Sequence, residues 1–254
     1  MTNAFKTQLS ALTGSKTVGR LVAIVPAGGV GARALGSSNA SLDQPKPKQY
    51  QLIAGVPMIR RAVQALLADP RIDEVIVAVQ ADDDWAQTIL ADLERVRVLS
   101  CAGATRALTV LGALKASANL LDQWVLVHDA ARPGLTPESL ARLIDQCWVH
   151  PVGGLLAIPA GDTLKQAQNG SQQVLQTVKR DDMWLAQTPQ MFRAQMLFTA
   201  INGALAAGFD VTDEASAMEW AGHSPLLVKG SVKNAKVTWP EDFEWVGSWL
   251  TNQQ

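Results

Sequence analysis

The sequence predicts an α/β fold in which helices flank a doubly wound, mostly parallel sheet. Short apolar runs, which suit strands buried on both faces, alternate with segments whose apolar residues recur at helical spacing. This alternation is typical of parallel sheets, because each parallel crossover needs a connection of helix length. In addition, Asn169-Gly170 lies between two alternating, rather polar runs and predicts an inserted β-hairpin.

The first half of the chain supplies most of this sheet. Leu21–Pro26 is an apolar, partly β-branched run, and 75–79 and 124–127 have the same character. The expected elements, in order, are strand 21–26, helix 58–68, strand 75–79, helix 82–93, strand 96–99, helix 105–119 and strand 124–127.

The second half continues the pattern and then interrupts it. Thr136 suits a helix N-cap and Pro137 the first helical position. Runs 162–166 and 174–178 form a hairpin arm at about 160–182, a kind of feature that commonly reaches a second subunit. The other expected elements are helix 136–149, strand 154–159, helix 193–207, a helix opening at 212–216, strands 226–228 and 235–238, and helix 240–250.

Composition narrows the class of protein. The 254 residues are 48% hydrophobic and 18% charged, with a net charge of −1, so we expect a globular protein without a broad surface for nucleic acid or membranes. No apolar run is long enough to span a bilayer. Two cysteines without metal or redox spacing fit a reduced compartment, and we expect a cytoplasmic protein. We expect one domain, 20–252, after a flexible N-terminal tail, 1–19; the tail's lack of acids is also faintly like an organelle transit segment.

A glycine-rich loop directly follows the first strand and predicts a phosphate site. Gly28, Gly29 and Gly31 fall within five residues, which allows positive φ and close approach of a ligand to backbone N–H groups. Arg33 and Lys48 then bring two positive charges. A nicotinamide-binding loop is a rival, but Pro45, Pro47 and the lack of a suitably spaced acid count against it. A P-loop motif is absent from the sequence, and a plain tight turn remains the structural alternative.

A second set of polar residues directly follows the strand predicted at 124–127. Asp129 is placed to hold a divalent cation or a ribose hydroxyl, and Arg132 to meet a phosphate. Alternatively, Asp129 only caps the turn. His128 is more typical of a packed histidine than of a ligand, and we do not predict a zinc site.

A series of motifs, in order, gives the chain a family resemblance. The motifs are VPAGGVG from Val25, PKQY from Pro47, HDAARP from His128, DTLK from Asp162, TPQMF from Thr188, TDEAS from Thr212 and KVT from Lys236. Together they resemble the 2-C-methyl-D-erythritol 4-phosphate cytidylyltransferases of the non-mevalonate isoprenoid pathway. The resemblance covers about 21–250 and implies a Rossmann-like fold of nucleotidyltransferase type.

The resemblance implies that a phosphate oxygen of the sugar phosphate attacks the α-phosphorus of CTP and that pyrophosphate leaves. Charge then builds on nonbridging and leaving oxygens, so fixed cations and N–H groups provide most of the help. Arg33, Lys48 and Lys236 are the expected catalytic residues. Asp129 is expected near Mg²⁺, or another divalent cation, directly or through water.

The family's binding residues map onto positions of this chain. The expected nucleotide-binding residues are Pro26, Ala27, Gly28, Gly29, Gly31, Gly103, Ala104, Arg106, Thr109, Asp129 and Ala130. The family more often has an acid at the position of Ala104 and a serine at that of Thr109; the hydroxyl is kept here but the acid is not. The expected acceptor-binding residues are Arg132, Asp162, Thr163, Lys165, Arg180 and Thr212.

Family members are homodimers whose arms interlock and bind the partner's sugar phosphate, so the expected partners are CTP, a small polyol phosphate and a second copy of the chain. Three alternatives stay open at this point. The chain could use another polyol phosphate such as ribitol 5-phosphate, because such enzymes share the loop, the basic residues and the fold. It could be a catalytically silent nucleotide-binding regulator, although the three cations Arg33, Lys48 and Lys236 argue against that. A dehydrogenase is the third alternative, which the absence of NAD(H) binding would exclude.

Overall fold

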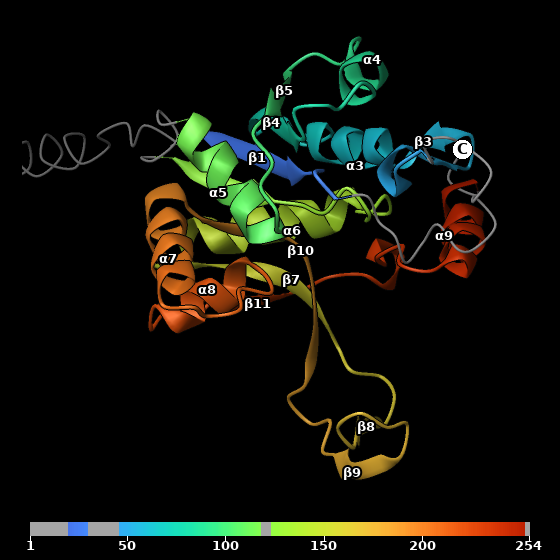
Figure 1. Cartoon of the computed structure of the whole chain (residues 1–254), viewed down its shortest axis with the longest axis vertical. Helices are drawn as coiled ribbons and strands as arrows, with labels where there is room; N and C mark the ends of the chain where they lie inside the picture. The colour runs from blue at the N-terminus through green and yellow to red at the C-terminus, as the bar shows by residue number, and fades with distance from the viewer. Residues whose placement is uncertain (1–19, 30–45, 118–122, 252–254) are drawn as a thin grey trace, which may run out of the picture.

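A seven-stranded sheet forms the centre of the molecule (Figure 1). The computed structural model describes residues 20–29, 46–117 and 123–251. The strand order is β11-β7-β10-β6-β1-β4-β5, and β10 runs antiparallel to both its neighbours while the other pairings are parallel. The strands are β1 (Leu21–Pro26), β4 (Ile72–Val79), β5 (Val96–Ser100), β6 (Trp124–Val127), β7 (Gly153–Pro159), β10 (Trp184–Arg193) and β11 (Leu226–Lys229). The predicted doubly wound, mostly parallel sheet is confirmed.

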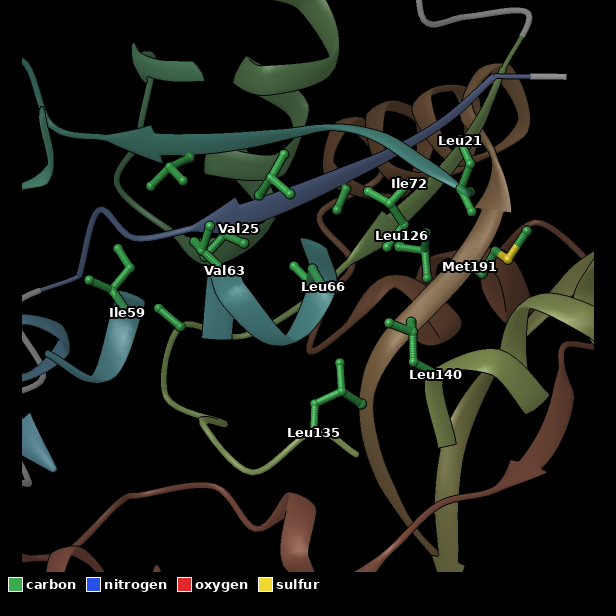
Figure 2. Packing of buried hydrophobic residues seen from close by; sticks show 14 of the residues in the cluster. Leu21, Val25, Ile59, Val63, Leu66, Ile72, Leu126, Leu135, Leu140 and Met191 are labelled. Carbon is green, nitrogen blue, oxygen red and sulfur yellow. The ribbon is translucent and has the colours of Figure 1, made fainter. Parts of the chain in front are cut away.

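Helices cover both faces of this sheet because β1 is apolar at every position. Leu21, Ala23 and Val25 point to one face, and Val22 and Ile24 to the other. The first face packs against α3 (Met58–Leu67), α4 (Ala86–Leu90) and α6 (Pro137–Val149), part of which is shown in Figure 2. The second packs against α5 (Arg106–Ala116), α7 (Ala194–Ala206) and α8 (Glu214–Trp220).

Side-chain caps fix where three of these helices begin. The hydroxyl of Thr136 accepts from the Ser139 N–H at 3.3 Å, with Pro137 at the first helical position, as predicted. Thr105 accepts from the Leu108 N–H in the same way. Asp213 begins α8 in a reciprocal capping box with Ser216. Each capped helix therefore starts at a defined place next to the edge of the sheet where β6 ends.

A smaller layer lies beside the main sheet. It contains the 3₁₀ turn η2 (Lys48–Tyr50), the pair β2 (Leu52–Ile53) and β3 (Val56–Pro57), the turn η4 (Val232–Asn234), and the C-terminal helix α9 (Pro240–Thr251). Val246 and Leu250 of α9 pack with Ile53 and Met58 in a separate apolar cluster. This layer brings the segment around Lys236 back to the segment around Lys48.

The predicted hairpin is present and extends away from the body of the molecule (Figure 1). Strands β8 (Leu164–Ala167) and β9 (Val174–Val178) pair antiparallel between the ends of β7 and β10. Gly170 in the turn has φ +74°, which explains why a glycine suits it. Most of the hairpin's side chains are exposed.

Two predicted elements and one segment without a predicted element need correction. The helix predicted over 82–93 is only Ala86–Leu90, because Asp83 instead accepts hydrogen bonds from the N–H groups of Trp85 and Ala86. The strand predicted at 235–238 is an extended loop, whose ladder-like contact is Val237 N–H to the Ala131 carbonyl at 2.8 Å. Residues 185–192, for which no element was predicted, belong to β10.

Candidate active site

A cavity of about 320 Å³ lies where β1 and β6 end. Ligands of doubly wound folds bind at this carboxyl edge of the sheet. The lining residues come from the glycine loop, η2, the start of α5, the turn after β6 and the loop before α9. They are Pro26, Ala27, Gly28, Gly29, Lys48, Gln49, Gly103, Ala104, Thr105, Arg106, Thr109, Asp129, Ala130, Ala131 and Lys236. The structure therefore gathers every described residue that was predicted to be catalytic or to bind nucleotide; Gly31 and Arg33 lie outside the described residues.

Two glycines of this edge, Gly28 and Gly103, are needed for space. A Cβ at Gly28 would lie 2.4 Å from the Cβ of Ala102, and one at Gly103 would lie 2.5 Å from that of Leu108. Gly29 faces open space. The idea that positive φ explains these glycines is wrong for Gly28 and Gly29, since neither has one. Close packing of the loop against the 101–103 segment is the physical reason at Gly28.

The start of α5 forms another wall of the cavity. The Thr109 hydroxyl donates to the Thr105 carbonyl at 2.9 Å and accepts from the Gly103 N–H at 3.2 Å. This hydroxyl therefore ties the 103–105 turn to the helix. Ala104 is exposed at the cavity and presents a methyl group where the resembling family more often has an acid.

The segment around Lys48 is anchored to the end of β1. Lys48 Nζ donates to the Val237 carbonyl at 2.7 Å, which places it beside the Lys236 segment. The buried amide of Gln49 donates to the Ala27 carbonyl at 2.9 Å, and the hydroxyl of Tyr50 donates to Asp83. Gln49 was not predicted as a site residue, although it lies inside the quoted PKQY motif. The two lysines thus reach one cavity from segments that are 188 positions apart by their numbers.

Asp129 is the centre of the charge arrangement. One carboxylate oxygen, Oδ1, accepts from Arg106 Nε at 2.9 Å. The other, Oδ2, lies 2.9 Å from Lys236 Nζ and 3.6 Å from Arg132 Nε. Arg106 in turn pairs with Glu214, through NH1 to Oε1 at 2.7 Å and NH2 to Oε2 at 3.0 Å. Three cations and two carboxylates therefore form one network, with a net charge of +1.

Burial and pairing act in opposite directions on these groups. Burial alone would raise the pKa of Asp129, but the charges of Arg106, Lys236 and Arg132 outweigh it and hold the pKa well below its ordinary value. For Glu214 burial wins, and its pKa is raised despite the pairing with Arg106. Burial opposes the charge of Arg106, but the two carboxylates outweigh it and raise the pKa of the guanidinium. Asp129 and Arg106 are thus charged at neutral pH.

The backbone of Asp129 is held by a separate buried chain. Its N–H donates to the Thr188 hydroxyl oxygen at 2.9 Å, and that oxygen lies 3.0 Å from His128 Nδ1. His128 Nε2 lies 3.1 Å from the Arg132 carbonyl, which can only accept, so Nε2 carries the proton and Nδ1 accepts from Thr188. Burial lowers the pKa of His128 to about 4. His128 is a packed, neutral histidine, as the sequence favoured.

The predicted acceptor-binding residues divide into two places, and those the structure describes do not line the cavity. Arg132 is buried, with NH1 donating to the Asn234 carbonyl at 2.8 Å. Thr212 is exposed just before α8. Asp162, Thr163, Lys165 and Arg180 belong to the hairpin region, where Lys165 donates to Thr177 Oγ1 and Arg180 to the Gly161 carbonyl. Their acceptor-binding role stays a prediction.

The donor set at this edge suits one kind of metal. Within the described residues there is no cluster of three or more His, Cys, Asp or Glu side chains that could enclose an ion. A single carboxylate beside a phosphate site fits Mg²⁺, which keeps several waters and binds through one or two carboxylates together with substrate phosphates. Asp129 is therefore the candidate metal ligand, and its Oδ2 is the oxygen on the side of Lys236.

Besides Gln49, two functional candidates that do not line the cavity were not predicted from the sequence. Glu214 was interpreted as an acid in a helix cap, but its side chain is 1% exposed and binds Arg106. Thr188 lay inside a quoted motif without a role, and its hydroxyl holds the Asp129 N–H. The sequence carried a weak signal for Thr188, in the motif TPQMF. It carried none for the Arg106 pairing, which joins residues 108 positions apart.

A doubly wound sheet with a glycine loop and converging cations at its carboxyl edge is the arrangement of a nucleotide-binding enzyme of nucleotidyltransferase type. Residues 21–252 match the model of the family 2-C-methyl-D-erythritol 4-phosphate cytidylyltransferase. This chain belongs to that family. The family resemblance found in the sequence is therefore confirmed.

Individual relatives agree with this assignment. A protein of the same name from Bordetella pertussis is 56% identical over 230 residues, which are 91% of this chain and 98% of the relative. One from Vibrio parahaemolyticus is 43% identical over 241 residues, 94% of this chain and 99% of the relative. A crystal structure of a 4-diphosphocytidyl-2C-methyl-D-erythritol synthase has a TM-score of 0.76 at 35% identity, covering 91% of this chain and 99% of that one.

In the part of the chain that the structure describes, none of the helices has the length and apolar character needed to cross a membrane.

Proposed function

We propose that this chain transfers the cytidylyl group of CTP to 2-C-methyl-D-erythritol 4-phosphate. The products are 4-diphosphocytidyl-2-C-methyl-D-erythritol and pyrophosphate, and the pathway is isoprenoid precursor biosynthesis. Family membership supports the reaction. The observation that carries the proposal is the convergence of Lys48 and Lys236 on one cavity beside Asp129 and the glycine loop.

The reaction makes a bond from an acceptor phosphate oxygen to the α-phosphorus and breaks the bond from that phosphorus to the pyrophosphate oxygen. Negative charge develops on the nonbridging and leaving oxygens, so fixed cations lower the barrier. Lys48 and Lys236 are fixed in this way, because each already holds a hydrogen-bonding partner at the cavity edge. In the proposal the phosphates of CTP bind within reach of these two ammonium groups and of Arg33.

In this proposal the base and sugar of the nucleotide lie against the cavity wall made by Gly103, Ala104 and Thr109. The closely packed glycines allow a planar base to approach the backbone there. The methyl of Ala104 offers no hydrogen bond, so backbone groups of the 103–105 turn and the Thr109 hydroxyl provide the polar contacts.

A Mg²⁺ ion, or another divalent cation, would be held by Asp129 and phosphate oxygens and would neutralise charge on the triphosphate. Arg106 keeps Asp129 ionised and oriented for this task. A cytoplasmic location is part of the proposal, and the free state of both Cys101 and Cys147 supports it.

The acceptor site and a homodimer complete the proposal. The hairpin of β8 and β9 extends away from the body of the molecule (Figure 1), and neither Thr163 nor Arg180 lines the cavity of its own chain. Both observations support a role for these two residues at the site of a second copy. Its exposed apolar side chains, Val174 and Leu175, support an arm that packs against that copy. Arg132 and Thr212 would approach the acceptor from the chain that holds the nucleotide.

The test is pyrophosphate release by the purified protein with CTP and Mg²⁺. Three reactions are compared: methylerythritol phosphate, ribitol 5-phosphate and no acceptor. Release with methylerythritol phosphate alone is the expected result. Release with ribitol phosphate alone would keep the mechanism and replace the acceptor, and silence with both, while CTP still binds, would indicate a nucleotide-binding regulator.

A further inference from the structure

Glu214 is an acid in an unusual position. It is the first residue of α8, its side chain is 1% exposed, and both of its carboxylate oxygens bind Arg106. Glu214 does not line the nucleotide cavity. A buried carboxylate needs compensating partners, so this pair is costly to bury and calls for an explanation.

The three guanidinium nitrogens of Arg106 are divided between two acids. Nε binds Oδ1 of Asp129, while NH1 and NH2 bind Glu214. A guanidinium is planar and can grip one carboxylate with two parallel bonds. Because Glu214 takes both terminal nitrogens, Arg106 reaches Asp129 with Nε, and Oδ2 of Asp129 faces Lys236 at 2.9 Å.

We propose that Glu214 is a positioning residue: by occupying the terminal nitrogens of Arg106, it stops Arg106 from closing a two-bond pair with Asp129 and so keeps Oδ2 available to Lys236 and to a magnesium–nucleotide. This inference rests on the proposed function, since it assigns Asp129 a task in the same site. Glu214 acts only through Arg106 and touches no substrate.

Glu214 is itself held in place from two sides. Gln190 of β10 accepts from the Ala215 N–H at 2.8 Å and donates to Asp213 at 2.9 Å. The capping box of Asp213 and Ser216 fixes the first turn of α8. The carboxylate is therefore pinned against the central sheet, so it can impose a geometry on Arg106.

Substitution Glu214→Gln tests this role with little change in volume. A glutamine amide offers one acceptor oxygen, so one terminal nitrogen of Arg106 becomes able to turn toward Asp129. We expect the rate of pyrophosphate release with saturating substrates to fall about 10–100-fold, the usual effect of losing a residue that orients a ligand. The affinity for CTP without metal, measured by calorimetry, should stay within about threefold, because the cavity wall is intact. Glu219→Gln, on the exposed part of the same helix, is the matched control and should match wild type.

A double-mutant cycle with Asp129→Asn separates positioning from general damage. If Glu214 acts through Asp129, Glu214→Gln should cost less than about threefold in the Asp129→Asn background. Arg106→Lys keeps the positive charge but loses the planar guanidinium, and its effect should be similarly non-additive with that of Glu214→Gln. If urea titrations show that Glu214→Gln is unfolded, Arg106→Lys takes its place in the cycle with Asp129→Asn. A crystal structure of Glu214→Gln should show Arg106 on both oxygens of Asp129.

Two results would overturn the inference. One is a double variant in which the fold-losses in rate of Glu214→Gln and Asp129→Asn multiply in full. The other is a Glu214→Gln protein whose affinity for CTP without metal falls as much as its rate. Failure of the proposed function looks different. In that case wild type and Glu219→Gln both release no pyrophosphate with methylerythritol phosphate, whatever happens at residue 214.

Discussion

The nucleotide cavity and the hairpin arm differ in where their side chains find partners. Around the cavity, Asp129, Arg106 and Glu214 satisfy one another within a single chain, and Asp129 and Glu214 are buried. On the arm, Val174 is 61% exposed and Leu175 is 58% exposed. Both regions carry predicted functional residues, but the described cavity side chains pair with one another, whereas these arm side chains face solvent.

This difference shows what each region needs in order to work. A preorganised charge network costs little further reorganisation when substrate binds, and this is its catalytic value. An exposed apolar pair on a two-stranded hairpin gains its stabilisation only by packing against something else. Substitutions in the cavity should therefore change the rate of the chemical step directly, whereas those on the arm should act through the proposed second subunit.

The largest effect should come from Lys236→Met. Removal of this cation should lower kcat by about 10²–10³-fold, as for the loss of one fixed donor to a developing charge. Stability should change little, because the side chain is 43% exposed and Asp129 keeps Arg106. Steady-state pyrophosphate release measures kcat, with Lys229→Met on β11 as the control. A kcat within threefold of wild type would remove Lys236 from the chemistry.

Low pH should lower the free energy of unfolding through His128 at the cavity edge and not through residues of the arm. His128 has a folded-state pKa of about 4, below its ordinary value, so the unfolded chain takes up the proton first. The stabilisation is fully present above about pH 6.5 and should fall by about 2–3 kcal/mol as the pH drops to about 4.5. Urea unfolding across this range measures it. His128→Gln should flatten the slope, His223→Gln should not, and equal slopes in all three proteins would exclude His128 as the cause.

Arg180→Ala should raise the KM for methylerythritol phosphate by about 10–100-fold, since a hydrogen bond to a charged group contributes about 1.5–3 kcal/mol. The KM for CTP should stay within about twofold, because Arg180 does not line the nucleotide cavity. Initial rates at varied concentrations of each substrate provide both constants. Lys179→Ala, which removes the neighbouring exposed cation, serves as the control. Equal effects on both KM values would remove Arg180 from the acceptor site.

The smallest effect should come from Leu175→Asp on the arm. In the proposed homodimer, loss of a partly buried aliphatic contact should raise the dissociation constant about 10-fold, at the low end of the value of a buried leucine. Sedimentation velocity over a dilution series measures it, and CTP affinity should be unchanged. Gln172→Asp adds the same charge without removing an apolar group, and it should leave the dimer intact. A dissociation constant that Leu175→Asp leaves unchanged would contradict packing of this part of the arm against a partner.

Most of the fold was predictable because its signals are local. Alternating or continuous apolar runs indicated β1, β4, β6 and β7. Thr136-Pro137 correctly indicated where α6 begins. Failures occurred where a distant residue competes with local preference. Asp83 accepts from Tyr50, a residue 33 positions away, as well as from the N–H groups of Trp85 and Ala86, and the helix predicted at 82–93 begins only at Ala86.

The site residues also divide into those that local sequence signals predicted and those that depend on distant contacts. Residues inside motifs, such as Lys48 and Asp129, were predicted by position and lie at the cavity. Glu214 was not predicted, because its partner Arg106 lies across the sheet edge and a Thr-Asp-Glu start is sufficiently explained as a helix cap. Sequence patterns of period two or four report neighbours along one element, and they contain no information on which side chains meet across loops.

The position of β10 in the sheet has a consequence for the order of assembly. β10 pairs between β6 and β7, so the outer edge of β6 remains unpaired until residues up to 193 have left the ribosome. Thr188 and Gln190, which hold Asp129 and the first turn of α8, arrive with the same strand. Contacts of such long separation form slowly. A nascent chain that stops short of β10 therefore carries an open strand edge and lacks the Thr188 contact to Asp129, and such open edges make folding intermediates prone to aggregate.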